Sequence, residues 1–147
     1  MIRLERQSTT AAHWGEAEYG HLFQGDPSQP RLALIADCDL VEQLHKELPR
    51  VVGFLIAHSI GADWELENVV VTDDFRGKGI GTRLIEEFLA RARQAKSQSV
   101  FLEVRESNTA ARALYAKVGF HEMGRRKSYY TAPLEDAVLY AKSLSAG

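Results

Sequence analysis

The sequence has 147 residues, a length that suits one domain, residues 1–147, with a sizeable hydrophobic core. A hydrophobic content of 45% and a charged content of 26% are ordinary for a soluble globular protein. The 18 basic and 20 acidic residues give a net charge of −2, so no basic field indicates a nucleic-acid partner. The sequence opens without an apolar signal-peptide core, and its best apolar run, residues 51–60, is about half a membrane span. We therefore expect a cytoplasmic protein with no membrane partner.

The cysteine and histidine patterns argue against a thiol or metal site. Cys38 is the only cysteine, and no Cys-His signature surrounds it, so a small, partly buried side chain is favoured over a nucleophile. The histidines are His13, His21, His45, His58 and His121. They show neither i, i+4 pairing nor an H-E-x-x-H pattern, and we expect no metal.

In chain order, the first part of the sequence predicts short elements separated by irregular segments. Residues 2–6 alternate as a short strand, and a weakly patterned helix follows to about Phe23. Residues 31–36 form an apolar strand after a proline-containing loop. Residues 37–50 fit either a short helix or an extended hairpin connection, and the pattern does not separate the two.

Two further strands are expected at residues 51–59 and 64–71, joined as an antiparallel hairpin by a turn at 61–63. The second of these strands contains three consecutive valines at 69–71, whose β-branched side chains suit a pleated strand.

A glycine-rich turn connects this strand to a long helix expected from about 79 to 95. Gly77, Gly79 and Gly81 remove Cβ atoms that would block close approach to the backbone. The free N–H groups of the first helical turn point outward at the positive end of the helix dipole, so this place can bind phosphate. The spacing fits neither G-x-G-x-x-G nor G-x-x-x-x-G-K-[ST], which disfavours dinucleotide and nucleoside-triphosphate loops. A role for these glycines in packing alone stays open.

In the second half, strands alternate with helices and the chain closes in a hairpin. The expected elements are a strand at 99–104, a helix at 108–118 with Gly119 at its end, and strands at 120–131 and 137–143 around Pro133. This order implies parallel pairing around crossover helices.

Three polar side chains stand out in this half. Glu103 is a carboxylate inside an otherwise apolar strand, where burial would disfavour its charged form. The structural alternative is an ion pair with an arginine such as Arg105 or Arg112. Tyr115 lies on the apolar face of its helix, as a core aromatic whose hydroxyl needs a partner. Asn108 is a candidate helix N-cap.

A series of short motifs occurs between residues 64 and 144. The motifs are Glu67-Asn68-Val69-Val70-Val71, Arg76-x-x-Gly79-x-Gly81, Leu102-Glu103-Val104-Arg105-x-Ser107-Asn108, Ala113-Leu114-Tyr115, Gly119-Phe120, Tyr129-Tyr130 and Glu135-Asp136-Ala137. Together they resemble the GNAT superfamily of N-acetyltransferases, and within it the ribosomal-protein-alanine N-acetyltransferases. The resemblance implies an α/β fold: a GNAT-type mixed, centrally splayed β-sheet with helices on both faces.

The resemblance also implies acetyl-coenzyme A (acetyl-CoA) as cosubstrate and no metal. The phosphates are expected at the glycine-rich turn, and the pantetheine arm is expected along the exposed backbone of the strand at 65–71. The implied cofactor-binding residues are Val69, Val70, Val71, Arg76, Gly77, Lys78, Gly79, Ile80, Gly81, Thr82 and Asn108.

The implied reaction is direct transfer of the acetyl group from the thioester to an amine, without an acyl-enzyme. Glu103 is the implied proton acceptor, and Tyr115 is the implied proton donor to the departing thiolate. Glu67 competes as the base, because other branches of the superfamily place the base on that strand.

The resemblance implies that the acceptor is the N-terminal α-amine of a protein or peptide, with a ribosomal protein as a candidate partner. We expect a monomer or weak dimer. Residues 1–50 lack the pattern expected in close relatives, so a small-molecule amine stays open as the acceptor. A non-catalytic acyl-CoA-binding domain ranks third, because both catalytic candidates are present. The basic run at residues 125–127 is expected to be solvated, in preference to attracting an acidic substrate.

Overall fold

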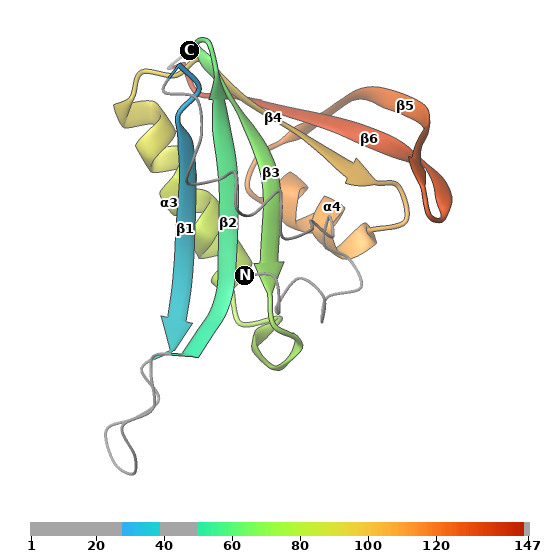
Figure 1. Ribbon diagram of the computed structural model, residues 1–147, viewed down its shortest axis with the longest axis horizontal. Coiled ribbons are helices and arrows are strands. Elements are labelled where there is room, and N and C mark those ends of the chain that lie inside the picture. The colour runs from blue at the N-terminus through green and yellow to red at the C-terminus, as the bar shows by residue number, and fades with distance from the viewer. Residues whose placement is uncertain (1–27, 39–49, 146–147) are drawn as a thin grey trace.

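A computed structural model describes residues 28–38 and 50–145 (Figure 1). Within them, six strands form one sheet in the order β1-β2-β3-β4-β6-β5. The strands are β1 (Arg31–Cys38), β2 (Arg50–Ile60), β3 (Asp63–Val71), β4 (Ser99–Arg105), β5 (His121–Thr131) and β6 (Leu134–Ser143). The helical elements are the 3-10 turn η1 (Asp73–Phe75) and the helices α3 (Ile80–Gln94) and α4 (Thr109–Lys117). The strand expected at residues 2–6, the helix expected to Phe23 and the segment 39–49 lie outside the described residues.

The sheet is mixed because one of its pairings, β3 with β4, is parallel. Helix α3 carries the chain from β3 to β4, and a parallel neighbour requires such a crossover. Only Trp64 with Val100 and Glu65 with Phe101 are paired between the two strands. Beyond these pairs the strands diverge, and α4 lies between their separated ends (Figure 1). The centrally splayed sheet expected from the resemblance is thus confirmed.

The second crossover differs from the expectation. Helix α4 leads to β5 at the edge of the sheet, and β6 lies between β4 and β5, antiparallel to both. The second helix therefore creates no direct parallel pair. Strand β6 also begins at Leu134, ahead of the expected residue 137, because Thr131 and Leu134 are already paired across a tight turn at residues 132–133.

One hydrophobic cluster joins the sheet to both described helices. Helix α3 buries its predicted apolar face, Leu84, Ile85, Phe88, Leu89 and Ala92. Helix α4 contributes Tyr115 to the same cluster. Each large apolar side chain of this kind contributes roughly 1.5–3 kcal/mol on burial, so the two helices are held firmly against the sheet where β3 and β4 part. Neither helix is long and apolar enough to cross a membrane, and the same holds for the rest of the described residues.

Strand β3 contains a bulge just beyond its pairing with β4. In the register with β2, Glu67 is an extra residue between Leu66 and Asn68. Leu66 and Val69 both pack into the cluster that contains the helices. The two residues between them, Glu67 and Asn68, therefore point to the opposite face. A regular strand would send only one of the two there, and re-aiming side chains is a common use of β-bulges.

Candidate functional site

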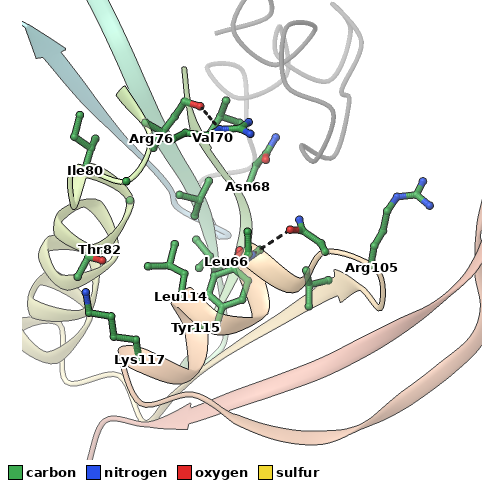
Figure 2. A pocket seen from close by; sticks show the side chains of 18 of the residues that line it. Leu66, Asn68, Val70, Arg76, Ile80, Thr82, Arg105, Leu114, Tyr115 and Lys117 are labelled. Atoms are coloured by element: carbon green, nitrogen blue, oxygen red, sulfur yellow. Dashed lines mark hydrogen bonds between the residues drawn. The ribbon is translucent and has the colours of Figure 1, made fainter. Parts of the chain in front are cut away.

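A cavity of about 430 Å³ opens where β3 and β4 part (Figure 2). Its walls come from residues 66–71 of β3, the turn and first helical residues within 75–82, the end of β4 at 103–105, and α4. Tyr130 of β5 also lines it. Figure 2 shows Ile80 and Thr82 of α3 and Leu114 and Tyr115 of α4 around the same space.

The cavity brings the predicted site residues together, with one exception. The lining includes Val69, Val70, Val71, Arg76, Gly77, Gly79, Ile80, Gly81, Thr82, Glu103, Asn108 and Tyr115. The exception is Lys78, whose Nζ lies 5.0 Å from the centre of the Phe75 ring. Residues taken from separate motifs thus share one cavity, whereas their individual roles stay predictions.

The glycine-rich turn has an open backbone at the start of α3. Gly77 and Gly79 have φ values of 69° and 81°, in the left-handed region that favours glycine. A Cβ on either would meet nothing within 4 Å in the described part of the chain. Gly79 occupies the N-cap position, and no side chain caps the helix, so first-turn N–H groups are left for an anion. Gly81 differs: a Cβ there would lie 3.2 Å from Cδ2 of Leu114. The packing interpretation therefore holds at Gly81, and the open-backbone interpretation holds at the other two positions.

The edge of β3 that faces β4 is left without a partner strand after Glu65. Arg76 holds the end of this strand, because its Nε donates to the carbonyl oxygen of Val71 at 3.2 Å (Figure 2). Its Nη2 also lies 3.2 Å from Oδ1 of Asp73. An unpaired strand edge suits an extended ligand that adds to the sheet by main-chain hydrogen bonds, as a pantetheine arm would.

Tyr115 is both a core residue and part of the cavity wall. It is 9% exposed and packs edge-on against Phe120, with ring centres 5.9 Å apart. Burial, together with the nearby Tyr130, raises the pKa of Tyr115 well above its ordinary value. The hydroxyl therefore keeps its proton at neutral pH and is available as a donor.

Glu103 contacts two side chains of β5, Arg126 and Tyr129. Its Oε1 lies 3.0 Å from Nε of Arg126, a residue of β5. A hydrogen bond with Glu103 is the main cause that raises the pKa of Tyr129. Arg105 and Arg112, the partners expected from sequence, pair with other carboxylates instead. The ion-pair interpretation was thus right in kind but wrong in its partner, which comes from a distant strand.

The basic run at 125–127 is not simply solvated. Arg125 pairs with Glu106 and Glu122, and Arg126 pairs with Glu103. Both side chains are exposed, at 41% and 56%, so they are solvated as expected; they also form ion pairs, because β5 brings them next to the carboxylates of β4 and of the turn that follows it.

Glu67 is held at one oxygen and open at the other. Its Oε1 lies 3.1 Å from Nδ1 of His58 and 3.5 Å from Nη2 of Arg31. No hydrogen bond reaches its buried Oε2 from the described residues. Burial raises the pKa of Glu67, and this outweighs the opposing effect of His58 and Arg31. Glu67 also lines the cavity, so the alternative base on β3 stays open.

Sequence reasoning assigned no role to Tyr130 and considered Arg105 only as an ion-pair partner of Glu103. The guanidinium carbon of Arg105 lies 4.2 Å from the centre of the Tyr130 ring. Arg105 also donates to the carbonyl oxygens of Pro133 and Ala132 at 3.3 and 3.4 Å. Burial raises the pKa of Tyr130 to about 12. Arg105 therefore ties the β5–β6 hairpin to β4 and holds Tyr130 against the cavity. The adjacent tyrosines at 129–130 were a visible signal, but this contact depends on the hairpin's position.

Asn108 has the capping role that its sequence position suggested. Its Oδ1 accepts a hydrogen bond from the backbone N–H of Ala111 at 3.1 Å, at the start of α4. It lines the cavity as well, so a contact with a ligand is compatible with the cap and stays a prediction. Across residues 28–38 and 50–145, no group of three or more His, Cys, Asp or Glu side chains is placed to hold a metal ion.

Comparison with known proteins finds similarity to acetyltransferases. The model of the Acetyltransferase (GNAT) family matches residues 3–120. The [ribosomal protein bS18]-alanine N-acetyltransferase of Haemophilus influenzae is 36% identical over 95 residues, which are 63% of this chain and 64% of that protein. The match thus spans a little under two thirds of that relative.

Among solved structures, the ribosomal-protein-S18-alanine N-acetyltransferase from Escherichia coli matches with a TM-score of 0.80 at 27% identity, covering 99% of this chain and 86% of that one. A candidate streptothricin acetyltransferase from Bacillus anthracis, in complex with acetyl coenzyme A, matches with a TM-score of 0.59 at 25% identity, covering 64% and 56%. The family model extends over most of the sequence and over the cavity's glycine-rich turn, β4 and α4. The chain therefore belongs to the acetyltransferase (GNAT) family.

Proposed function

We propose that the chain is an acetyl-CoA-dependent N-acetyltransferase that modifies the N-terminal α-amine of a peptide or protein. The observation that carries this proposal is one cavity lined by an uncapped, glycine-rich helix start, an unpaired strand edge, Glu103 and Tyr115. The names of the Haemophilus and Escherichia relatives support a ribosomal protein as the acceptor. An enzyme with such an acceptor would act in the cytoplasm.

The donor side of the cavity has the features that acetyl-CoA requires. The open backbone at Gly77 and Gly79 and the first turn of α3 would receive the pyrophosphate. The backbone at 69–71 would hydrogen-bond the pantetheine arm as an added strand. The thioester would then lie near Tyr115, beyond the unpaired edge of β3.

In the proposed reaction, the neutral amine attacks the thioester carbonyl carbon directly. The new C–N bond forms, the C–S bond breaks, and the amine loses a proton to Glu103, directly or through water. The Tyr115 hydroxyl hydrogen-bonds the departing sulfur and supplies its proton. Because burial disfavours the Tyr115 phenolate, the proton must be replaced within the turnover, and the proton released by the amine is the available source.

The chemistry of the acceptor favours an α-amine over a lysine side chain. An α-amino group has a pKa of about 7.7–8.0, whereas that of lysine is about 10.4. Near neutral pH the α-amine is on the order of a few hundred times richer in the nucleophilic neutral form. A site with a single carboxylate as base can therefore act on an α-amine with less assistance than lysine would need.

The test is mass spectrometry with acetyl-CoA and two matched peptides. One peptide has a free N-terminus and no lysine, and the other is blocked at its N-terminus and contains one lysine. We expect acetylation of the first peptide only. Preferential acetylation of the blocked peptide would overturn the α-amine assignment. Turnover of small amines but of neither peptide would favour the small-molecule alternative.

A further inference from the structure

The bulge in β3 places two polar side chains next to each other on the wall of the cavity. Glu67 and Asn68 both line it, and both point to the face away from the helices. Each has one buried atom that no described residue reaches by a hydrogen bond: Oε2 of Glu67 and Nδ2 of Asn68. Asn68 is only 6% exposed. Buried polar atoms without partners are rare in native structures, and sites that bind a ligand are among the places where they occur.

The other contacts of Glu67 account for only one of its two carboxylate oxygens. Oε1 of Glu67 is occupied by His58 and Arg31, which fixes the carboxylate and leaves Oε2 as its free oxygen. In Figure 2 the Asn68 amide points away from Tyr115. Both residues precede the three valines along which the pantetheine arm is proposed to lie.

One of the two atoms accepts a hydrogen bond, and the other donates one. An ionised carboxylate oxygen only accepts, and an amide nitrogen only donates. Within one residue of an extended chain, the N–H and the C=O point to the same side, which is how a strand residue forms two hydrogen bonds with its neighbour. The pair of atoms is thus complementary to one residue of an extended peptide. A simple amine has no carbonyl group and satisfies only one of them.

We infer that Glu67 and Asn68 recognise the main chain of the acceptor peptide at its second residue. Oε2 of Glu67 accepts that residue's N–H, and Nδ2 of Asn68 donates to its carbonyl oxygen. This inference rests on the proposed function and deepens it, because it restricts the acceptor to peptides and gives Glu67 a binding role distinct from the base. The incoming N–H also compensates for the burial that raises the pKa of Glu67.

The first test removes one N–H from the acceptor. An N-terminal alanyl peptide is compared with its ester analogue, in which oxygen replaces the N–H between the first two residues. With the parent enzyme, KM for the ester should be about 10-fold higher, the effect expected for one lost hydrogen bond. In Glu67→Leu, KM for the peptide should rise by about 10-fold and the difference between peptide and ester should largely disappear.

The second test removes the hydrogen-bond donor of Asn68 without changing the shape of the side chain. Asn68→Asp replaces Nδ2 by an oxygen that repels the carbonyl, so KM for the peptide should rise by about 10-fold or more, with kcat within a few-fold of the parent. Glu65→Leu is the matched control. Glu65 lies on the same strand and also approaches His58, at 3.6 Å, but it does not line the cavity. Its KM should stay within about two-fold of the parent, because it removes no contact with the acceptor.

Affinity for acetyl-CoA, measured by calorimetry, separates the possible outcomes. Equal KM values for peptide and ester with the parent enzyme would overturn the inference and leave α-amine acetylation standing. Acetyl-CoA binding without acetylation of any peptide would overturn the proposed function, and this inference with it. A fall in kcat at unchanged KM in Glu67→Gln would identify Glu67 as the base and refute its binding role. Glu67→Gln and the ester comparison separate a binding role of Glu67 from a role as the base even if Glu67→Leu does not fold.

Discussion

The two sides of the cavity are built in different ways. We call the side proposed to bind acetyl-CoA the donor side and the side proposed to bind the amine the acceptor side. The donor side consists mainly of backbone: the left-handed glycines at 77 and 79, the start of α3 and the unpaired edge of β3. The acceptor side consists of side chains from distant strands, such as Glu67 with His58 and Glu103 with Arg126. A backbone site survives most substitutions around it, whereas a side-chain site changes with each residue. One fold can therefore keep its donor while its acceptor varies.

The two sides also differ in how their buried polar groups are satisfied. Two of the buried side-chain atoms without a hydrogen-bond partner among the described residues lie on the acceptor side, Oε2 of Glu67 and Nδ2 of Asn68. Each such atom costs about 1–3 kcal/mol if it stays dry. Native proteins tolerate such costs mainly at functional sites. Unpartnered buried atoms on this side are what the proposed binding of an acceptor there would explain.

The largest effect is expected at Tyr115, where the two sides meet. Tyr115→Phe keeps the ring packed against Phe120 but removes the hydroxyl, so kcat should fall by about 10²–10⁴-fold. Affinity for acetyl-CoA should stay unchanged, because the donor side is backbone. Steady-state kinetics with calorimetry check both statements. A rate within a few-fold of the parent would leave Tyr115 as a core aromatic only.

The next effect tests the backbone nature of the donor side. Gly79→Glu places a carboxylate at the proposed pyrophosphate site and strains a left-handed residue, so affinity for acetyl-CoA should fall by about 100-fold. Gly61→Glu is the matched control, since Gly61 also has a positive φ, 62°, and lies in the β2–β3 turn, outside the cavity lining. It should lose similar stability but keep its affinity. Undiminished binding of acetyl-CoA by a folded Gly79→Glu variant would contradict the proposed pyrophosphate site at the start of α3.

The contrast between local backbone features and contacts between distant strands also explains what could be predicted from sequence. The strand–turn–helix unit around residues 64–95 was predicted almost to its boundaries, because its signals are local: three valines, glycines and a helical apolar period. The placement of β6 between β4 and β5 was not, because no short-range pattern states which strands become neighbours. The bulge at Glu67 has no visible signal either, since it appears only in the register with β2.

Within the site, the predicted residues line the cavity except for Lys78, and the cap made by Asn108 was predicted, but the partner of Glu103 was not. Glu103 was identified, yet its ion pair with Arg126 depends on the placement of β5 relative to β4, with β6 between them. The hydrogen bonds from Arg105 to the β5–β6 hairpin likewise depend on where the hairpin lies in the fold. Sequence motifs specify which groups are present, and the tertiary register determines what they contact.

A smaller effect separates the two carboxylates of the acceptor side. Glu103→Gln should lower kcat/KM by about 10–100-fold, less than the loss of the proton donor, because part of an α-amine is already neutral near pH 7. It should also abolish the acid-side rise of the pH–rate profile. Glu67→Gln should keep that rise. Loss of the rise in Glu67→Gln alone would transfer the base to β3, and equal mild losses in both would point to a water chain.

Glu67→Gln should also change stability, in a direction set by its raised pKa. Because the folded state holds this proton more tightly than the unfolded state, the stability from Glu67 is present below the unfolded pKa. It is lost as pH rises through the folded pKa. At pH 7 the variant should therefore melt higher, by about 2–4 °C if the cost is about 1 kcal/mol, and the gain should vanish near pH 4. A lower melting temperature at pH 7 would show that the contacts with His58 and Arg31 dominate.

The smallest expected effect concerns Asn108, a side chain that is predicted both to cap α4 and to contact the donor. Asn108→Ala removes the cap of α4 and should lower the free energy of unfolding by about 1 kcal/mol, whereas Asn108→Asp keeps the cap. If the amide also contacts the coenzyme, the Asp variant should bind acetyl-CoA several-fold more weakly at undiminished stability, because it loses a donor and adds a negative charge. Denaturant unfolding and calorimetry on both variants separate the two roles. Parent-like affinity in both would confine Asn108 to the cap and leave the donor side to the backbone alone.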